Sequence, residues 1–419
     1  MILDRTKPPK VNDIQDIRLP LIDSGIINGI NSHSYLDSGS KTFKIELLTK
    51  GSQLYGDTAA LPQLALRMLN EGTIDKSSSQ LAEAIDSLGS FIEISPGFDY
   101  SSITIYGLAK YFEQNIRLLS EIMYQPEFSP ESLNTLKIKE KDKLKLNLEK
   151  GSYISSINLR KSLFGTNHPY GGYLLESQID AVSTEDVSTF HDTYTKNFEF
   201  YISGDLPDNY KTIIAQHFTS QVDNLDQNVT LKPVLHSSDT FHQDSKFIQS
   251  SIKIGKRLFN RTHGDYFPFI VANELLGGFF GSRLMKNIRE DKGYTYGIHS
   301  NLYALLHDGY FVISTDVKGD NQQETIDEIF MEINILRTEL VTLKELNVAK
   351  NYMIGVFTNS FSSPFASISK FKTLHSQGMG MDFYRTYISK IRKVTPEKIL
   401  ECASDYLDPA SLTASIAGA

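Results

Sequence analysis

The sequence predicts an α+β protein built from two duplicated domains, each a largely antiparallel β-sheet covered by helices. Two observations support this fold class. A weak internal repeat relates the two halves of the 419 residues, and each half runs through the same order of strand-like and helix-like patterns. A polar stretch separates the halves, so we expect an N-terminal domain at 1–219, a linker at 220–245 and a C-terminal domain at 246–419.

The repeat begins in a predicted strand. In Lys41–Ser52, KTFKIELLTKGS, apolar residues alternate before a glycine turn, as in a half-buried strand. Each half continues with a helix, a pair of strands and at least two more helices. A shift of 204 residues gives three matches in order, which place Phe43 on Phe247, Gly51 on Gly255 and Gly89 on Gly293.

Near the end of each half the shift is 212 residues. It overlays Val182–Tyr194 on Val394–Tyr406, and both segments have helix-start signals. Ser183 or Thr184 can accept from the first-turn amides of one helix, and Thr395 precedes a proline at the start of the other. Each helix leads into an apolar terminal strand, FEFYISGDL in the first half and LTASIAGA in the second.

Composition limits the possible functions. Lys and Arg number 42 against 50 Asp and Glu, a formal charge of −8, which argues against nucleic acid as a partner. Since the chain has one cysteine, no signal-peptide pattern and no long uncharged apolar run, we expect a soluble cytoplasmic protein with no membrane partner.

Sequence motifs for known chemistry are scarce. No two of the ten histidines are three or four residues apart, so no helix presents a histidine pair to a metal, and one cysteine excludes a thiolate zinc site. The glycine-rich segment LLGGFFGSRL lacks the lysine of a phosphate-binding loop. No GxSxG nucleophile motif is present, and nothing favours a serine triad.

Four segments together resemble the insulinase and mitochondrial processing peptidase family of zinc peptidases, in its short bacterial form. The resemblance implies one half of a clam-shell, in which two chains close around a peptide chamber. It covers nearly the whole chain, and ELLGGFFGSRLMKNIREDKGYTYGI is its strongest part. The segments are Gly51–Thr73, Asn167–Gly172, Ser203–Leu206 and Glu274–Ile298.

Active members of the family carry an H-x-x-E-H zinc motif. The resemblance places its two histidines at Gln63 and Arg67 and its glutamate at Leu66, and the third ligand, about 75 residues further on, near Lys143. Arg67 and Lys143 would repel a divalent ion by roughly 2 to 8 kcal/mol each, depending on the local dielectric. We therefore expect no zinc here, and no peptidase activity from this chain alone. Gln63 and Arg67 either solvate the helix or line the chamber.

The family's substrate-holding pair is retained. The resemblance assigns Arg289 and Tyr296, seven residues apart in NIREDKGYTY, to a carbonyl of the bound peptide. Arginine and tyrosine donors suit a carbonyl that becomes an oxyanion. The alternative is that Arg289 pairs with Glu290 or Asp291 and that Tyr296 packs on a strand. Three turn glycines are expected to allow a close approach to peptide or partner: Gly277, Gly278 and Gly281.

These expectations describe the non-catalytic subunit of a heterodimeric zinc peptidase. A homologous zinc-bearing chain would be the partner, extended peptides would be the substrates, and zinc would be expected only in that partner. Two alternatives remain open: a peptide-binding or structural scaffold of the same fold without a proteolytic partner, and an independent hydrolase with a relocated site.

Overall fold

The computed structural model describes residues 14–220, 231, 239–244 and 247–418. Most of the predicted linker at 220–245 lies outside these residues. No helix among the described residues is both long and apolar enough to cross a lipid bilayer.

The first half contains a sheet of six strands within the described residues, centred on β3. Strand β3 pairs antiparallel with β7 and β8, whereas β2 and β8 are parallel. The predicted strand is confirmed, and Phe43, Ile45 and Leu47 are fully buried. It is not half-buried as the alternation suggested, because Lys44 and Glu46 on its other face are buried too. In sheet order the strands are β1 (Asp23–Ile27), β2 (Ile30–Leu36), β8 (Phe198–Gly204), β3 (Thr42–Thr49), β7 (Ser101–Leu108) and β6 (Phe91–Ser95).

The second half repeats this topology. Its central strand β10 pairs antiparallel with β12 and β13, and β13 is parallel to β9. The two sheets have the same strand order when each is followed from its hairpin edge strand, β6 or β11. The order β6-β7-β3-β8-β2 then corresponds to β11-β12-β10-β13-β9, which confirms the duplicated α+β fold. The strands are β11 (Thr295–Ala304), β12 (Gly309–Lys318), β10 (Gln249–Leu258), β13 (Thr413–Gly418) and β9 (Thr240–Gln243), the last of which lies inside the predicted linker.

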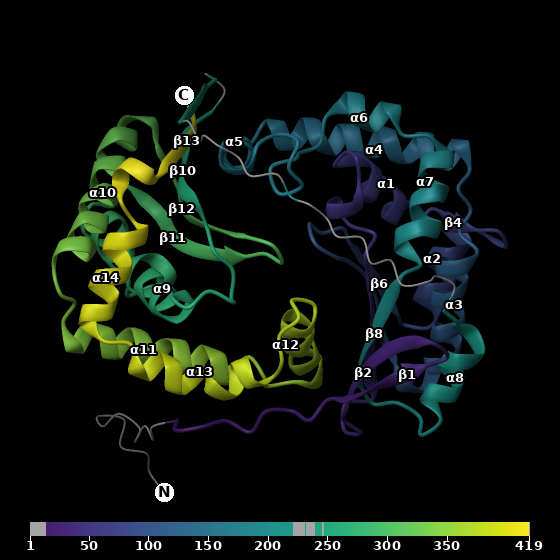
Figure 1. Cartoon of the computed structure of the whole chain (residues 1–419). Coiled ribbons are helices and arrows are strands. Elements are labelled where there is room, and N and C mark those ends of the chain that lie inside the picture. The colour runs from purple at the N-terminus through teal and green to yellow at the C-terminus, as the bar shows by residue number, and fades with distance from the viewer. Residues whose placement is uncertain (1–13, 221–230, 232–238, 245–246, 419) are drawn as a thin grey trace, which may run out of the picture.

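Helices surround the two sheets (Figure 1). In the first half they are α1 (Ala60–Met68), α2 (Ser78–Ser87), α3 (Phe112–Tyr124), α4 (Pro130–Leu148), α5 (Gly151–Phe164), α6 (Glu176–Ala181), α7 (Thr184–Phe190) and α8 (Tyr210–His217). In the second half they are α9 (Tyr266–Asn273), α10 (Gln322–Thr338), α11 (Leu343–Asn359), α12 (Pro364–His375), α13 (Asp382–Lys393) and α14 (Pro396–Tyr406). The π-helical segments are η3 (His191–Thr195), η4 (Glu274–Gly278) and η5 (Met285–Asp291). Short 3-10 helices are η1 (Gln53–Tyr55), η2 (Ala109–Tyr111), η6 (Gly319–Asn321) and η7 (Pro409–Ser411). A small two-stranded sheet pairs β4 (Gly72–Thr73) with β5 (Lys76–Ser77).

The helix signals of the repeat are confirmed, with one exception among the glycines. Ser183 caps α7 and Thr395 caps α14, each accepting from a first-turn amide. Gly89 and Gly293 follow helical segments with φ of 61° and 67°, the left-handed conformation that favours glycine. The match of Gly51 with Gly255 is wrong, because Gly255 lies within β10 opposite Val312, and not in a turn.

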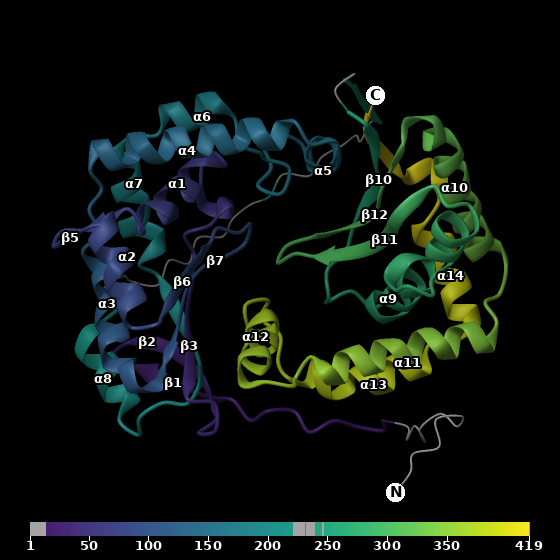
Figure 2. The same cartoon turned by 180° about the vertical axis from the view of Figure 1, so that it is seen from behind.

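Each half contributes one helix that packs against the sheet of the other half. Helix α5 packs against β10 and β13 of the second sheet, and α12 packs against β8 and β2 of the first. Figures 1 and 2 show α12 in front of the first sheet, between the two halves, with α5 reaching the second sheet. The 212-residue shift of the repeat overlays α5 on α12, so the exchange is reciprocal.

A buried ionic cluster fastens α12 to the first sheet. Glu46 on β3 is 2% exposed and forms ion pairs with Lys44, at 2.8 Å, and with Lys372 of α12. Lys44 also donates to Ser369 of α12 at 3.1 Å. Burial opposes ionisation of Glu46, but the two lysines hold its pKa below the usual value, so the carboxylate stays charged.

Glu46→Gln should therefore lower the free energy of unfolding by about 3 kcal/mol, because it leaves two lysines next to a neutral, buried side chain. Urea denaturation followed by circular dichroism measures this. Asp382→Asn, which breaks the exposed pair of Asp382 with Arg385, should cost less than about 0.5 kcal/mol. Equal losses in the two variants would contradict the proposed role of Glu46.

Candidate functional site

Helices α1 and α4 bring Gln63, Arg67 and Glu140 together. Gln63 and Arg67 are one helical turn apart on α1 and project from the same face. Gln63 Nε2 donates to Glu140 Oε2 at 2.6 Å, and Arg67 Nη1 donates to Glu140 Oε1 at 2.6 Å. Glu140 is 4% exposed, so each oxygen of a buried carboxylate has its own donor from α1.

Glu140, and not Lys143, is the charged residue of α4 that forms hydrogen bonds with side chains of α1. The buried residues Leu136, Glu140 and Leu144 recur every four positions and form the inward face of α4. Lys143 precedes Leu144 by one residue, a rotation of about 100°, and is exposed. The sequence-based assignment missed Glu140 because a count of about 75 residues without an alignment cannot resolve a shift of three. The only signal was an acidic residue at the buried spacing of α4.

Leu66 is fully buried in the hydrophobic core that also contains Ile103 and Ile105 of β7. Its side chain therefore packs toward the sheet and offers no acid or base.

The side chains at this position do not fit a zinc ion. Zinc sites in proteins use imidazole nitrogens, thiolates and carboxylates, and here only Glu140 belongs to that set. Both of its oxygens are already bound, and the guanidinium of Arg67 supplies the positive charge that compensates the carboxylate. A divalent ion at this carboxylate would be repelled by Arg67.

The glycine-rich turn packs inside the chain. A Cβ on Gly277 would lie 2.8 Å from the amide nitrogen of Ser300 on β11, and a Cβ on Gly278 would lie 2.6 Å from the Glu274 carboxylate. Gly281 is similarly restricted by the ring of Phe279, at 2.7 Å. These glycines therefore permit close internal contacts. Arg283 follows the turn and donates to both oxygens of Glu345 on α11, at 2.8 and 3.0 Å, as a structural anchor.

Arg289 and Tyr296 remain available to another molecule. The guanidinium of Arg289 on η5 lies 4.8 Å from the ring centroid of Phe280, which is itself 58% exposed. Within the described residues, Arg289 forms no ion pair with Glu290, Asp291 or any other carboxylate. Tyr296 is 92% exposed, beside an irregularity in the pairing of β11 with β12. Arg289 is therefore half-buried against Phe280, whereas Tyr296 is exposed and does not pack on a strand.

The turn of the β11–β12 hairpin contacts Asp99 and Tyr170 of the first half, and Tyr296 is not part of that turn. The amide of Leu306 donates to Asp99 Oδ2 at 2.9 Å, and the amide of His307 donates to Tyr170 at 3.3 Å. Tyr296 lies eight residues before Ala304 on the same strand, roughly 26 Å away at about 3.3 Å per residue. The tyrosine is therefore far from the hairpin turn, at the end of β11 where the paired strand β12 carries Asp316. That aspartate lines a cavity together with Glu149 and Ser152 of the first half.

Comparison with known proteins agrees with this geometry. Residues 181–353 match the family model described as "Peptidase M16 inactive domain". This chain is a relative of the M16 peptidases. The resemblance seen in its motifs is thereby confirmed, and the loss of zinc ligands on α1 accords with a relationship to the inactive members.

Proteins similar to this chain carry contrasting names. The "Non-peptidase homolog YmxG" of Helicobacter pylori is 23% identical, over 85% of this chain and 84% of its own. The "Uncharacterized zinc protease YmxG" of Bacillus subtilis is 24% identical, over 72% and 75%. The crystal structure of a peptidase M16 inactive domain from Pseudomonas fluorescens shares the fold, with a TM-score of 0.83, 20% identity and coverage of 95% and 98%.

The α1–α4 geometry predicts that two substitutions create a zinc site. Gln63→His with Arg67→His would place two imidazoles at i and i+4 beside Glu140, a His₂Glu set. This double variant should bind one more zinc ion per chain than the parent protein, measured by equilibrium dialysis and metal analysis. Adding Glu140→Gln should remove the extra ion. Retention of the extra zinc without Glu140 would show that Glu140 is not the third ligand.

Proposed function

We propose that this chain is the non-catalytic subunit of a heterodimeric zinc peptidase. A homologous, zinc-bearing chain would be its partner, and the two would enclose a chamber for extended peptides. This chain would need no zinc of its own at α1, and its Arg289 and Tyr296 would hold a carbonyl of the substrate. We also propose a cytoplasmic location, which suits the single buried thiol of Cys402.

One contrast between the two halves carries this proposal. The carboxylate of Glu140 is saturated by Gln63 and Arg67, so the α1–α4 position is closed by contacts within the chain. In the second half, Tyr296 keeps its donor exposed, and Arg289 is half-buried against Phe280 with no ion pair among the described residues. A chain that has lost its hydrolytic groups but retains free substrate-holding groups is suited to complete the site of another chain.

The chemistry of the pair supports the same role. A guanidinium offers several N–H donors in a planar array, and a phenol offers one O–H donor. Both stabilise negative charge that develops on a carbonyl oxygen during peptide hydrolysis. Tyr296 is 92% exposed, which supports contact with a peptide held by a second chain.

A scaffold function is the second candidate. The closed α1–α4 position also suits a peptide-binding or structural protein that has no proteolytic partner, and the name of the relative in Helicobacter pylori, a non-peptidase homologue, favours it. The two candidates differ in whether a chain carrying H-x-x-E-H accompanies this one in native extract.

Arg289→Ala should lower kcat/KM of the reconstituted heterodimer by about 100-fold, and Tyr296→Phe by about 10-fold, because each removes a donor to the developing oxyanion. Turnover of a peptide library by the mixed subunits measures this, with size-exclusion chromatography to show that assembly is intact.

Arg385→Ala is the matched control, since Arg385 is exposed on α13 and pairs only locally with Asp382. Turnover equal to wild type in the Arg289 and Tyr296 variants would remove their proposed role. If no zinc-bearing chain is recovered and no mixture hydrolyses peptides, the scaffold function is correct.

A further inference from the structure

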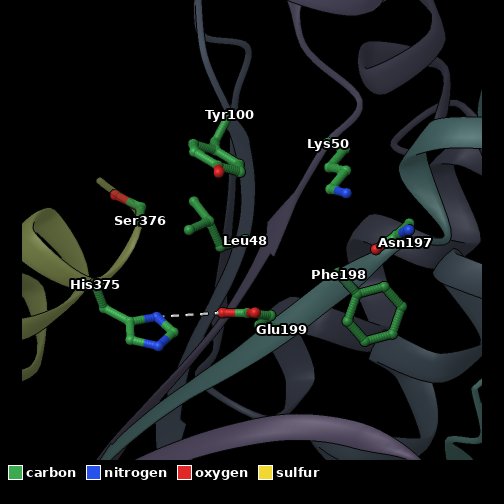
Figure 3. Close-up of a pocket in the computed structure, with 8 residues that line it drawn as sticks. All are labelled: Leu48, Lys50, Tyr100, Asn197, Phe198, Glu199, His375 and Ser376. Atoms are coloured by element: carbon green, nitrogen blue, oxygen red, sulfur yellow. Dashed lines mark ion pairs between the residues drawn. The ribbon is translucent and has the colours of Figure 1, made fainter. Parts of the chain in front are cut away.

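Three side chains with metal-ligating atoms meet where α12 crosses the first sheet. They are His33 on β2, Glu199 on the neighbouring strand β8, and His375, the last residue of α12. One ligand atom of each lies within 4.8 Å of the other two. Glu199 Oε2 is 3.5 Å from His375 Nδ1 and 3.8 Å from His33 Nε2. Figure 3 shows Glu199 and His375 pointing toward each other across the boundary between the halves.

His33 presents a nitrogen that lacks a hydrogen-bond partner. Its Nδ1 lies 2.8 Å from Ser24 Oγ, whereas its Nε2 is buried and makes no hydrogen bond within the described residues. His33 as a whole is 6% exposed. When Nδ1 donates to Ser24, Nε2 carries a lone pair that faces the Glu199 carboxylate. Two acceptors that face each other in a buried place repel unless a cation lies between them.

Neighbouring groups hold the three ligands in place. Tyr201 donates to Glu199 Oε2 at 3.1 Å, and Asn31 donates to Glu199 Oε1 at 3.3 Å. The Tyr201 oxygen also lies 2.8 Å from His375 Nδ1, a contact that the ion would replace, because Nδ1 binds a metal only through its lone pair. The imidazole of His375 stacks on the ring of Phe371 one turn earlier in α12. Outer contacts of this kind orient the ligands of metal sites.

We propose that His33, Glu199 and His375 bind a divalent transition-metal ion of the zinc type, which fastens α12 to the first sheet. Bonds of about 2.1 Å in a tetrahedral site place ligand atoms about 3.4 Å apart. The separations of 3.5 and 3.8 Å are within a few tenths of that value. Rotation of the His375 side chain, at the end of α12, can shorten the third separation, between the ligand nitrogens of His33 and His375.

A cavity of about 100 Å³ adjoins the cluster and gives the ion a route of entry. Glu199 and His375 form part of its wall, so a water molecule in the cavity can complete a site of three protein ligands. Most of its other lining residues carry polar groups, as Figure 3 shows: Lys50, Tyr100, Asn197 and Ser376, with Leu48 and Phe198.

The proposed ion differs from the zinc of a peptidase in its location and in its role, which is structural. It lies on the sheet face that α12 covers, whereas the closed α1–α4 position is formed by two helices of the first half. Its ligands come from both halves, and Glu46 with Lys372 fastens the same helix to the same sheet. Binding would therefore stabilise the closed arrangement of the two halves.

The test uses the full chain, stripped with a chelator and titrated with Zn²⁺ in a calorimeter. Wild type should bind one ion per chain and unfold at a higher temperature with zinc than without it. Glu199→Gln and His375→Gln should each weaken binding on the order of 100-fold and abolish the rise in unfolding temperature. His307→Gln, which changes an exposed histidine outside the cluster, should behave as wild type.

Circular dichroism should show that His375→Gln is folded, since its side chain is 37% exposed at the end of a helix. The proposal is overturned if wild type binds no zinc, or if it binds zinc equally after His375→Gln. It is also overturned if zinc leaves the unfolding temperature unchanged while protonation alone stabilises the chain, because a proton would then be the cation between His33 and Glu199.

Discussion

The reciprocal exchange of α5 and α12 is the constraint on which the arrangement of the two halves depends. Helix α5 places Leu159 against Tyr310 and Val312 of β12, so apolar burial joins the first half to the second sheet. Helix α12 meets the opposite sheet through aromatic contacts of Phe365 and Phe371 and through Lys372, which is bound to the buried Glu46. Both joints therefore bury apolar groups, and the second adds an ion pair. The proposed metal ion at His375 would add a further contact to that second joint.

Compensation of a buried carboxylate links the fold to the proposed function. Glu140 is buried beside α1, and a charge in that position requires a partner of opposite sign. Arg67 is that partner here, and the ion pair keeps α1 and α4 together without a metal. The chain thereby keeps the helix arrangement of the M16 fold while the chemistry at α1 changes. Arg289 and the exposed Tyr296 take no part in this ion pair, since they belong to the other half.

Much of the fold could be predicted from the sequence because its signals are local. The caps at Ser183 and Thr395 and the left-handed Gly89 and Gly293 all depend on a few neighbouring residues, and the structure confirms them. The alternation around Phe43 correctly predicted a strand, but burial of its second face depends on the docking of α12. Gly255 was assigned wrongly because a turn glycine and a strand glycine look the same in sequence. In β10, a Cβ on Gly255 would lie 2.3 Å from the carbonyl oxygen of Phe311, a contact between strands.

The sequence by itself determined the duplication, the M16 resemblance and the absence of histidine at positions 63 and 67, since each depends on residue identity in order along the chain. Only the tertiary structure decided that Glu140 lies beside Arg67 and that His33, Glu199 and His375 meet. The physical reason is that helix rotation selects which residue of α4 faces inward, and strand pairing with α12 docking joins residues from distant parts of the chain. Spacing in sequence carries neither kind of information.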